Sequence, residues 1–235
     1  MCGRFALTLP EDAMAQLFAA RPANDLPPLP NYNICPTNRV HAVWTEEGAR
    51  RLGAMRWGFL PHWYETESDG PLLINARAET IAKKPAFARA ARERRCLVPA
   101  SGFYEWTKDA QGTSWPWYIH PAEGALFAFA AVWQDWAGPE GPVRSCAIVT
   151  CDASPAIAHI HHRMPVVVAQ PDWALWLGEA GHGAARLMRP APDSALACHR
   201  VGREVNSNRA SGPQLTEPAG PAPGQSPEEA SGAGS

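Results

Sequence analysis

Short runs of apolar, β-branched and aromatic residues recur along this chain, and most are bounded by Gly, Pro or Asp. Runs of this length and composition are typical of β-strands rather than of helices. The strands predicted in this way cover residues 4–7, 40–44, 52–57, 72–74, 96–106, 115–119, 126–133, 143–150 and 165–169.

Helical periodicity is confined to short segments. Residues 8–11 read Thr-Leu-Pro-Glu, which has the form of a capping box with Pro in the first turn. Met14, Leu17 and Phe18 follow at helical spacing. A helix is therefore expected over about residues 9–20.

Three more helices and one irregular loop follow from the same patterns. The helical patterns lie at about residues 85–95, 171–178 and 183–188, and the Pro- and Asn-rich residues 22–38 predict the loop. Many strands with few short helices between them indicate an α+β fold. We expect its dominant, antiparallel sheet system to close around a core.

Composition separates one folded domain from a tail. The 235 residues, 46% of them apolar and ten of them Trp, are enough for a folded domain with a sizeable core. From about residue 211 the chain is mainly Gly, Pro, Ala and Ser, without an aromatic residue. We therefore expect a domain over residues 1–210 and a disordered, acidic tail over residues 211–235.

The sequence also bears on location and charge. No apolar run approaches the ~20 residues of a membrane span, and no secretory signal is apparent, so a cytoplasmic location with reduced cysteines is expected. The formal net charge is −2, and removing the three acids of the tail from the 23 of the chain leaves 20 acidic against 21 basic residues. The surface is therefore not strongly basic, although residues 50–95, which are rich in Arg and Lys, could line a local basic groove.

Cys2 directly follows the initiator methionine, and a second residue this small normally allows Met1 to be removed. The mature chain would then begin with an amine and a thiol on adjacent carbons. Such an aminothiol condenses with an aldehyde through its amine, and its thiol then closes a thiazolidine ring. With reference pKa values of about 7.7–8.0 for the amine and about 8.5 for the thiol, both groups are partly nucleophilic at neutral pH. Taken alone, the position is equally consistent with chance.

Asn75 and Arg77 follow the predicted strand 72–74 and stand two residues apart, so they face the same side of an extended chain. An amide and a guanidinium placed in this way suit a polar ligand and a phosphate. A solvated strand end is the alternative, and it is favoured when this pair is taken alone.

Glu105 lies inside the aromatic segment Gly-Phe-Tyr-Glu-Trp of residues 102–106. A carboxylate among apolar neighbours is costly unless it is paired, and its pKa tends to rise. This is the setting of a general acid or base. Strand alternation could equally leave Glu105 facing water.

His159, His161 and His162 end a short helix that Ser154-Pro155 is expected to begin. One of these histidines could act as a proton shuttle. Three histidines in four positions are also compatible with a metal site. The chain has no CxxC motif, however, so zinc is a weak alternative.

Residues 32–37 and 56–59 place Tyr, Asn, Pro, Arg and Trp in loops or at strand ends. Such residues stack on bases and bind phosphates in sites for single-stranded nucleic acid. Packing in the core or at its rim is the commoner fate of Trp and Tyr.

Six segments together resemble the signatures of one family in order and in spacing. They read Cys-Gly-Arg-Phe, Tyr-Asn-Ile-Cys-Pro-Thr, Arg-Trp-Gly, Asn-Ala-Arg-Ala-Glu-Thr, Gly-Phe-Tyr-Glu-Trp and Ile-His-His-Arg-Met-Pro. Each motif is weak alone, but six in register are specific. From Cys2 to about Leu215 the chain resembles the SRAP family, the SOS response-associated peptidases.

The resemblance implies a fold and a function. The fold would consist of predominantly antiparallel β-sheets closed into a barrel-like core with short peripheral helices. The protein would bind single-stranded DNA at abasic sites in the DNA damage response and form a covalent crosslink through its N-terminal cysteine. Autoproteolytic (peptidase) and abasic-site lyase activities are also implied. No cofactor, metal or membrane is implied, and we expect a monomer.

The family's residue roles carry over onto matching positions. The resemblance makes Cys2 the nucleophile and places three residues around it, namely Asn75, Glu105 and His161. By general chemistry, loss of water needs an acid, which His161 could be, and a nearby Glu105 would stabilise the cationic imine. The residues implied to contact DNA are Arg4 and Arg77 on phosphates, Asn33 and Pro36 beside the lesion, and Trp57 and Trp106 on flanking bases.

Two positions depart from the family pattern. Cys35 occupies a loop position that is often Ala, and His162 stands where Asp is common. We expect His161 to be the functional histidine because it aligns with the first His of the motif.

Two other classes of function remain open from the residues alone. N-terminal-nucleophile amidohydrolases, including glutamine amidotransferases, also begin with Cys-Gly and use the α-amine as a base. That class gives no role to Glu105 or His161, and no second synthetase domain is apparent. A non-covalent reader of modified or single-stranded DNA, with Cys2 merely buried, is the other alternative.

Overall fold

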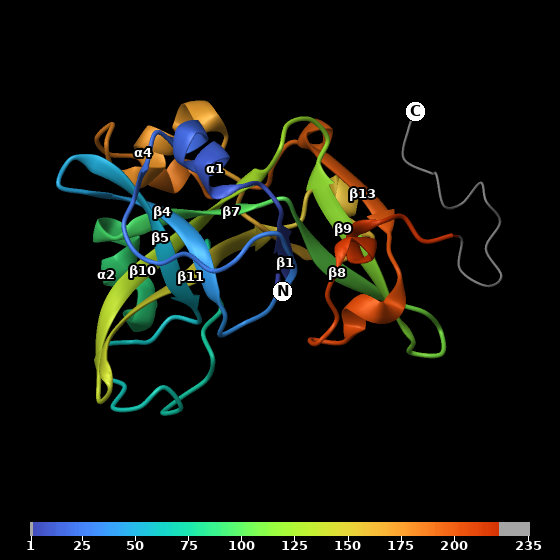
Figure 1. Cartoon of the computed structure of the whole chain (residues 1–235), viewed down its shortest axis with the longest axis horizontal. Helices are drawn as coiled ribbons and strands as arrows, with labels where there is room; N and C mark the ends of the chain where they lie inside the picture. The colour runs from blue at the N-terminus through green and yellow to red at the C-terminus, as the bar shows by residue number, and fades with distance from the viewer. Residues whose placement is uncertain (1, 221–235) are drawn as a thin grey trace.

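Five strands close into a barrel that forms the larger half of the structure, a computed structural model that describes residues 2–220 (Figure 1). In sequence order they are β4 (Arg39–Glu46), β5 (Ala49–Trp57), β7 (Arg95–Ala100), β10 (Phe127–Gly138) and β11 (Gly141–Asp152). Antiparallel pairs run β11–β10–β7–β4–β5, and a parallel pairing of β5 with β11 closes the ring. The expected barrel-like, mainly antiparallel α+β fold is confirmed.

Three short strands extend this barrel. β2 (Arg21–Pro22) pairs with β5, while β6 (Asn75–Arg77) and β12 (Arg163–Pro165) both pair with β11. The register sets Asn75 opposite Ile148 and Arg163 opposite Asp152. Two of the signature segments therefore meet along the end of one strand.

A second sheet lies beside the barrel, with β1 next to it in Figure 1. It contains β1 (Phe5–Leu7), β3 (Asn31–Ile34), β8 (Gly102–Lys108), β9 (Ser114–Pro121) and β13 (Leu196–Arg200) in the order β13-β9-β8-β1-β3. The sequence indicated neither β3, which lies in the expected loop, nor β13.

The single strand predicted over residues 96–106 is divided between the two sheets. The chain leaves β7 at Ser101, whose backbone N–H donates to the carbonyl of Ala6 at 2.7 Å, and enters β8 at Gly102. A Cβ at Gly102 would approach the Tyr118 ring to 2.4 Å and the Ile119 carbonyl to 2.7 Å, so only glycine fits this turn. The apolar run could not reveal the division because both halves are buried strands.

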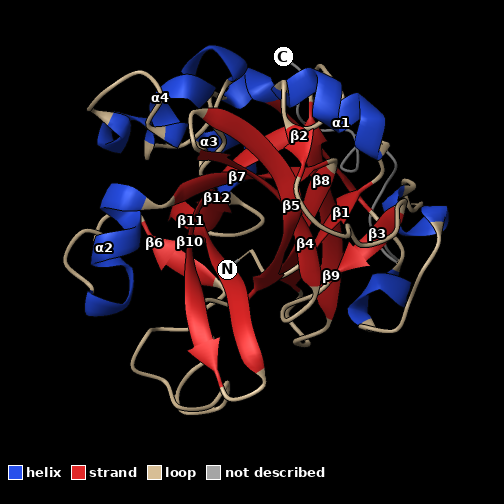
Figure 2. Cartoon of the chain, turned by 60° about the vertical axis from the view of Figure 1, so that its left-hand side comes forward, coloured by secondary structure: helices blue, strands red, loops and turns tan. Residues whose placement is uncertain are grey.

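Helices cover the outside of the sheets (Figure 2). The α-helices are α1 (Glu11–Phe18), α2 (Pro85–Glu93), α3 (Pro155–Ala158) and α4 (Trp173–Leu177), and the 3₁₀ helices are η1 (Gln170–Asp172), η2 (Ala184–Leu187), η3 (Asp193–Ala195), η4 (Arg203–Asn206) and η5 (Pro213–Thr216). None of the helices among residues 2–220 is long and apolar enough to cross a membrane.

The predicted capping box at the start of α1 does not form. The helix begins at Glu11 with Pro10 as its N-cap residue, and no side chain caps it. Thr8 instead pairs with Ser101, whose hydroxyl accepts the Thr8 backbone N–H at 2.9 Å. The strand expected over residues 165–169 is also displaced, since β12 ends at Pro165 and only Val167 forms a bridge, to Phe129.

Aromatic rings join the barrel to the second sheet. The Phe5 ring of β1 lies 5.1 Å from the Trp57 ring and 6.1 Å from the Phe129 ring, both of which belong to barrel strands. Phe103 of β8 packs on Phe129 at 5.9 Å. All four rings are buried, so β1 is held against the end of the barrel by edge-to-face contacts.

The ordered domain extends beyond the boundary expected at residue 210. Leu215 of η5 is 1% exposed and packs in a small cluster with Tyr104, Tyr118 and Val205. The His199 ring donates from Nε2 to the Thr216 carbonyl at 2.8 Å, and the Ala219 N–H reaches the Arg200 carbonyl at 2.8 Å. The tail therefore does not begin at residue 211, and the rest of the predicted tail, 221–235, lies outside the described residues.

Leu215→Ala is expected to lower the free energy of unfolding by about 2–5 kcal/mol, because it leaves a cavity beside Tyr104 and Tyr118. Urea denaturation measures the change. Gln214→Ala, at the exposed neighbouring position, should unfold like the wild-type protein. Equal midpoints for Leu215→Ala and wild type would contradict the packing of η5.

Candidate functional site

The pairing of β1 with β8 brings Cys2 to Glu105. Phe5 lies opposite Phe103, and the Tyr104 N–H donates to the Arg4 carbonyl at 2.9 Å, so the same register continues to Gly3 opposite Glu105. Cys2 is fully buried, and the charge of Glu105 acts on its thiol. Residues more than 100 positions apart in the chain thus share one site.

Glu105 is a buried carboxyl group, with 4% of its surface exposed. Burial raises its pKa to about 7, because desolvation disfavours the charged form more strongly than nearby positive charges favour it. Near neutral pH the group is therefore divided between its acid and its carboxylate. Of the two alternatives for Glu105, the structure has the buried one.

His161 lies close to this carboxyl group, on the segment between α3 and β12. Its Nδ1 is 3.8 Å from Oε1 of Glu105. The Arg163 backbone N–H donates to the same nitrogen at 3.0 Å and orients the ring. Burial lowers the pKa of His161, which favours the neutral ring. The exposed His162 ring stacks on it at 4.4 Å.

The thiol of Cys2 is held in its protonated form. Burial raises its pKa well above the usual range, and the charge of Glu105 raises it further. A thiolate is the stronger nucleophile, so this thiol needs a base at the moment it reacts. Glu105 is the carboxyl group whose charge acts on this thiol.

Asn75 and Arg77 share one face of β6, with the buried Ala76 between them, as their spacing predicted. The Asn75 amide donates from Nδ2 to the Ile74 carbonyl at 3.1 Å. Its Oδ1 is buried and accepts no hydrogen bond from the described residues. A buried acceptor without a donor is costly, so this oxygen is suited to a ligand that brings an N–H or O–H. Arg77 is exposed.

Trp57 is part of the core, which contradicts its predicted contact with DNA bases. The side chain is fully buried, its ring packs on Phe5, and its indole N–H donates to the Ile74 carbonyl at 3.0 Å. The tryptophan therefore fastens the residue that precedes Asn75 to the core. Its position at the end of β5 did not reveal which way the ring faces.

Arg4 and Asn33 are also engaged within the protein, so a phosphate contact by Arg4 is not supported. The Arg4 guanidinium donates to Asn33 Oδ1 and to the Val205 carbonyl, both at 2.8 Å, and also to Asn208 Oδ1. Asn33 is buried, and its amide donates to the Ala210 carbonyl at 2.7 Å. Both side chains hold the C-terminal segment 203–210 against the second sheet.

Trp106 and Pro36 remain half-buried. The Trp106 indole N–H donates to Asn206 Oδ1 at 2.6 Å, and the Arg4 guanidinium lies 5.7 Å from its ring centre. Trp106 thus lies on the same face of the second sheet as Arg4, whereas Glu105 points to the other face by strand alternation. Contacts of Trp106 and Pro36 with DNA stay predictions.

Arg163 was quoted in the sequence motif without a role, and it joins two parts of the site. Its guanidinium pairs with Glu79 at 2.8 and 3.0 Å, with Asp152 at 2.6 Å and with the Thr150 carbonyl at 2.7 Å. Glu79 belongs to the Asn75 motif, and the Arg163 N–H orients the His161 ring. One buried arginine therefore links the strand of Asn75 to the position of the histidine.

Trp63 is an exposed aromatic residue to which the sequence motifs gave no role. It is 48% exposed in the loop between β5 and β6, where Leu72 is 50% exposed. The loop is anchored just after Trp63, since Glu67 pairs with Arg56 at 2.9 Å and the Tyr64 carbonyl accepts the Trp136 indole N–H at 2.7 Å. Its position shortly before the Asn75 motif is the feature of the sequence that could have indicated a place near the site.

These contacts define a class of protein: a folded domain with a buried N-terminal thiol beside a carboxyl–imidazole pair. Within the described part of the chain, no group of three or more His, Cys, Asp or Glu side chains is arranged to hold a metal ion. The side chains of the site itself offer a thiol, a carboxyl group and an imidazole, which can transfer protons and act as nucleophiles.

Comparison with known proteins agrees with this class. The profile of the SRAP family, described as SOS response associated peptidase, matches residues 1–208, and the chain belongs to this family. It is 33% identical over 224 residues to the abasic site processing protein YoqW of Bacillus subtilis, covering 92% of this chain and 99% of that one. It is 28% identical over 226 residues to the abasic site processing protein YedK of Escherichia coli, covering 93% and 100%.

A solved structure supports the fold. A protein from Bacteroides thetaiotaomicron superposes with a TM-score of 0.81 at 22% identity, covering 93% of this chain and 100% of that one. At this identity the likeness concerns the arrangement of the strands and helices alone.

Glu105 should make stability fall as the pH rises. Because its pKa is raised to about 7 in the folded protein, the folded state binds the proton more tightly, and this contribution is full at low pH and is lost as the pH rises through about 7. Between pH 5 and 7 the stability of wild type relative to Glu105→Gln should decrease, by at most about 1.4 kcal/mol per pH unit for one proton.

Urea denaturation of both proteins across this pH range measures the difference. The lowered pKa of His161 acts in the opposite direction, but His161 is present in both proteins. Stability curves that run parallel from pH 5 to 7 would contradict a raised pKa for Glu105.

Proposed function

We propose that this protein processes abasic sites in single-stranded DNA by capturing them as a covalent thiazolidine at Cys2. The observation that carries the proposal is the buried Cys2 thiol beside Glu105, with His161 3.8 Å from that carboxyl group. The relatives named as abasic site processing proteins support the choice of substrate. The proposal requires a free Cys2 amine and therefore removal of Met1.

The first step joins the Cys2 amine to the aldehyde carbon C1′ of the ring-opened sugar. The new carbinolamine loses its hydroxyl as water, which needs a proton from a nearby acid. Near neutral pH Glu105 is partly in the acid form, whereas the lowered pKa of His161 leaves that ring mostly neutral. We therefore assign the proton for water loss to Glu105, and not to His161 as the sequence had led us to expect.

The second step closes the ring. After giving up its proton, Glu105 is a carboxylate next to a cationic imine, which it stabilises electrostatically. The Cys2 sulfur attacks C1′, the C=N electron pair moves to nitrogen and leaves a neutral ring amine, and the thiol proton passes to Glu105, which returns to its acid form. One water is released for each adduct, and no iminium remains to drive β-elimination of the strand. Amine and thiol sit on one residue, so proximity favours ring closure.

The remaining site residues would hold the sugar and the strand. Asn75 Oδ1 has no donor among the described residues and could accept a hydrogen bond from the opened sugar. Arg77 is exposed on the same face and could pair with a phosphate, and Trp63 could stack on a neighbouring base. The captured lesion would then be shielded within the damage response.

Cys2→Ala is expected to abolish the stable adduct with an oligonucleotide that carries one abasic site. After Met1 removal the variant keeps an N-terminal amine, so it can still form an imine, and strand scission should appear in place of the crosslink. Denaturing gels and intact mass spectrometry measure both products. An adduct stable to heat from Cys2→Ala would contradict the mechanism, and no adduct from the Met1-processed wild type would favour non-covalent binding.

Trp63→Ala and Arg77→Ala should each weaken binding to single-stranded DNA, by about 1–3 kcal/mol for a stacked base in the case of Trp63. Arg77→Ala should also reduce the slope of log K against log salt by about 0.7, the value for one phosphate contact on a single strand. Fluorescence anisotropy at several salt concentrations measures both. Arg89→Ala, an exposed cation paired with Glu93 on α2, is the matched control. An unchanged salt slope for Arg77→Ala would contradict a contact between Arg77 and a phosphate.

A further inference from the structure

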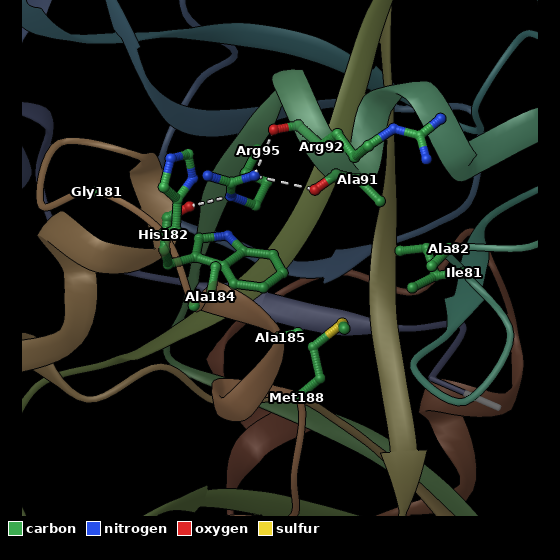
Figure 3. A pocket seen from close by; sticks show the side chains of 12 residues that line it. Ile81, Ala82, Ala91, Arg92, Arg95, Gly181, His182, Ala184, Ala185 and Met188 are labelled. Atoms are coloured by element: carbon green, nitrogen blue, oxygen red, sulfur yellow. Dashed lines mark hydrogen bonds between the residues drawn. The ribbon is translucent and has the colours of Figure 1, made fainter.

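A cavity of about 420 Å³ lies between α2, α4 and η2, and none of its lining residues belongs to the site of Cys2 (Figure 3). Its wall is mostly apolar and includes Ile81, Ala82, Ala91, Trp176, Ala184 and Met188. Its volume falls within the range of about 300–1,000 Å³ that is common for small-molecule sites. The cavity is therefore a second candidate binding site.

The guanidinium of Arg95 and the imidazole of His182 lie together at one end of this cavity. Figure 3 shows the Arg95 guanidinium beside the His182 ring, with Met188 at the other end. The Arg95 Nε donates to the Trp176 carbonyl at 2.5 Å, and Nη1 donates to the carbonyls of Ala91 at 3.0 Å and Arg92 at 2.7 Å. These bonds leave Nη2 without a hydrogen bond to the described residues.

The charge of Arg95 is not matched by an acid. All three of its acceptors are neutral carbonyl groups, and no carboxylate among residues 2–220 pairs with it. The carbonyls at the C-terminal end of α2 favour a cation, but they do not neutralise it. Burial lowers the pKa of Arg95, as expected for a half-buried cation without a counter-ion. An anion that enters the cavity would complete this pairing.

We propose that the cavity binds a carboxylate that carries an adjacent apolar group, with the carboxylate on Arg95 and His182 and the apolar group against Trp176 and Met188. Such a group occurs in small arylalkyl acids and at the C-terminus of a peptide that ends in an aromatic residue. A carboxylate fits better than a strand of nucleic acid, because a single guanidinium nitrogen, Nη2, is available and most of the wall is apolar. The site is independent of the chemistry at Cys2.

Isothermal titration of the full chain tests the proposal with three matched probes: 3-phenylpropionate, the neutral 3-phenylpropanamide, and propionate, which lacks the ring. We expect saturable 1:1 binding of 3-phenylpropionate, and binding at least about tenfold weaker for the other two probes. A hexapeptide ending in Phe, with a free or an amidated C-terminus, separates the two sources. Tighter binding of the free peptide than of 3-phenylpropionate assigns the site to peptide ends, and weaker binding assigns it to small acids.

Variants locate the binding. Ala185→Phe fills the cavity from an exposed lining position and should abolish binding, and His182→Ala should weaken it several-fold. Arg89→Ala lies on the same helix outside the cavity and is the control. Ala185→Phe should crosslink abasic DNA at the wild-type rate, which also shows that it is folded. Equal binding of acid and amide, or unchanged binding by Ala185→Phe, would overturn the proposal.

Discussion

The pairing of β1 with β8 is the contact on which the site depends. It places the first residues of the chain beside a carboxyl group located about 100 positions later, and the Phe5 ring holds the strand against Trp57 and Phe129. Without this packing, Cys2 would lie on a free chain end and its thiol would have an ordinary pKa. Burial of one short strand therefore creates both the proximity and the low dielectric that the proposed chemistry needs.

The desolvation that makes Glu105 costly to bury also gives it the pKa that the proposed proton transfers need. Desolvation raises its pKa to about 7, the value at which one group can give and then take a proton near neutral pH. The same environment lowers the pKa of His161 and keeps the Cys2 thiol protonated. The three groups thus differ in protonation because of one shared, dry environment. This difference, rather than the residue types alone, orders the proposed steps.

Arg163 shows how separate motifs become one site. Its guanidinium joins Glu79 and Asp152, and its backbone N–H orients His161. The arginine thereby ties the segment of Asn75 to the segment of the histidine, around the end of β11. Since the carboxylates it pairs with are partly exposed, its contribution is better described as fixing geometry than as adding stability.

The sequence by itself determined the features that depend on short-range spacing and composition. These are the succession of short strands, the place of Cys2 behind Met1, the shared face of Asn75 and Arg77, and the family. Only the tertiary structure decided which side chains face the site. Trp57 faces the core, and the Arg4 guanidinium donates to the carbonyl of Val205, 201 positions later. Trp63, by contrast, is exposed to solvent. Burial is set by elements far apart in the chain, so local patterns could not reveal it.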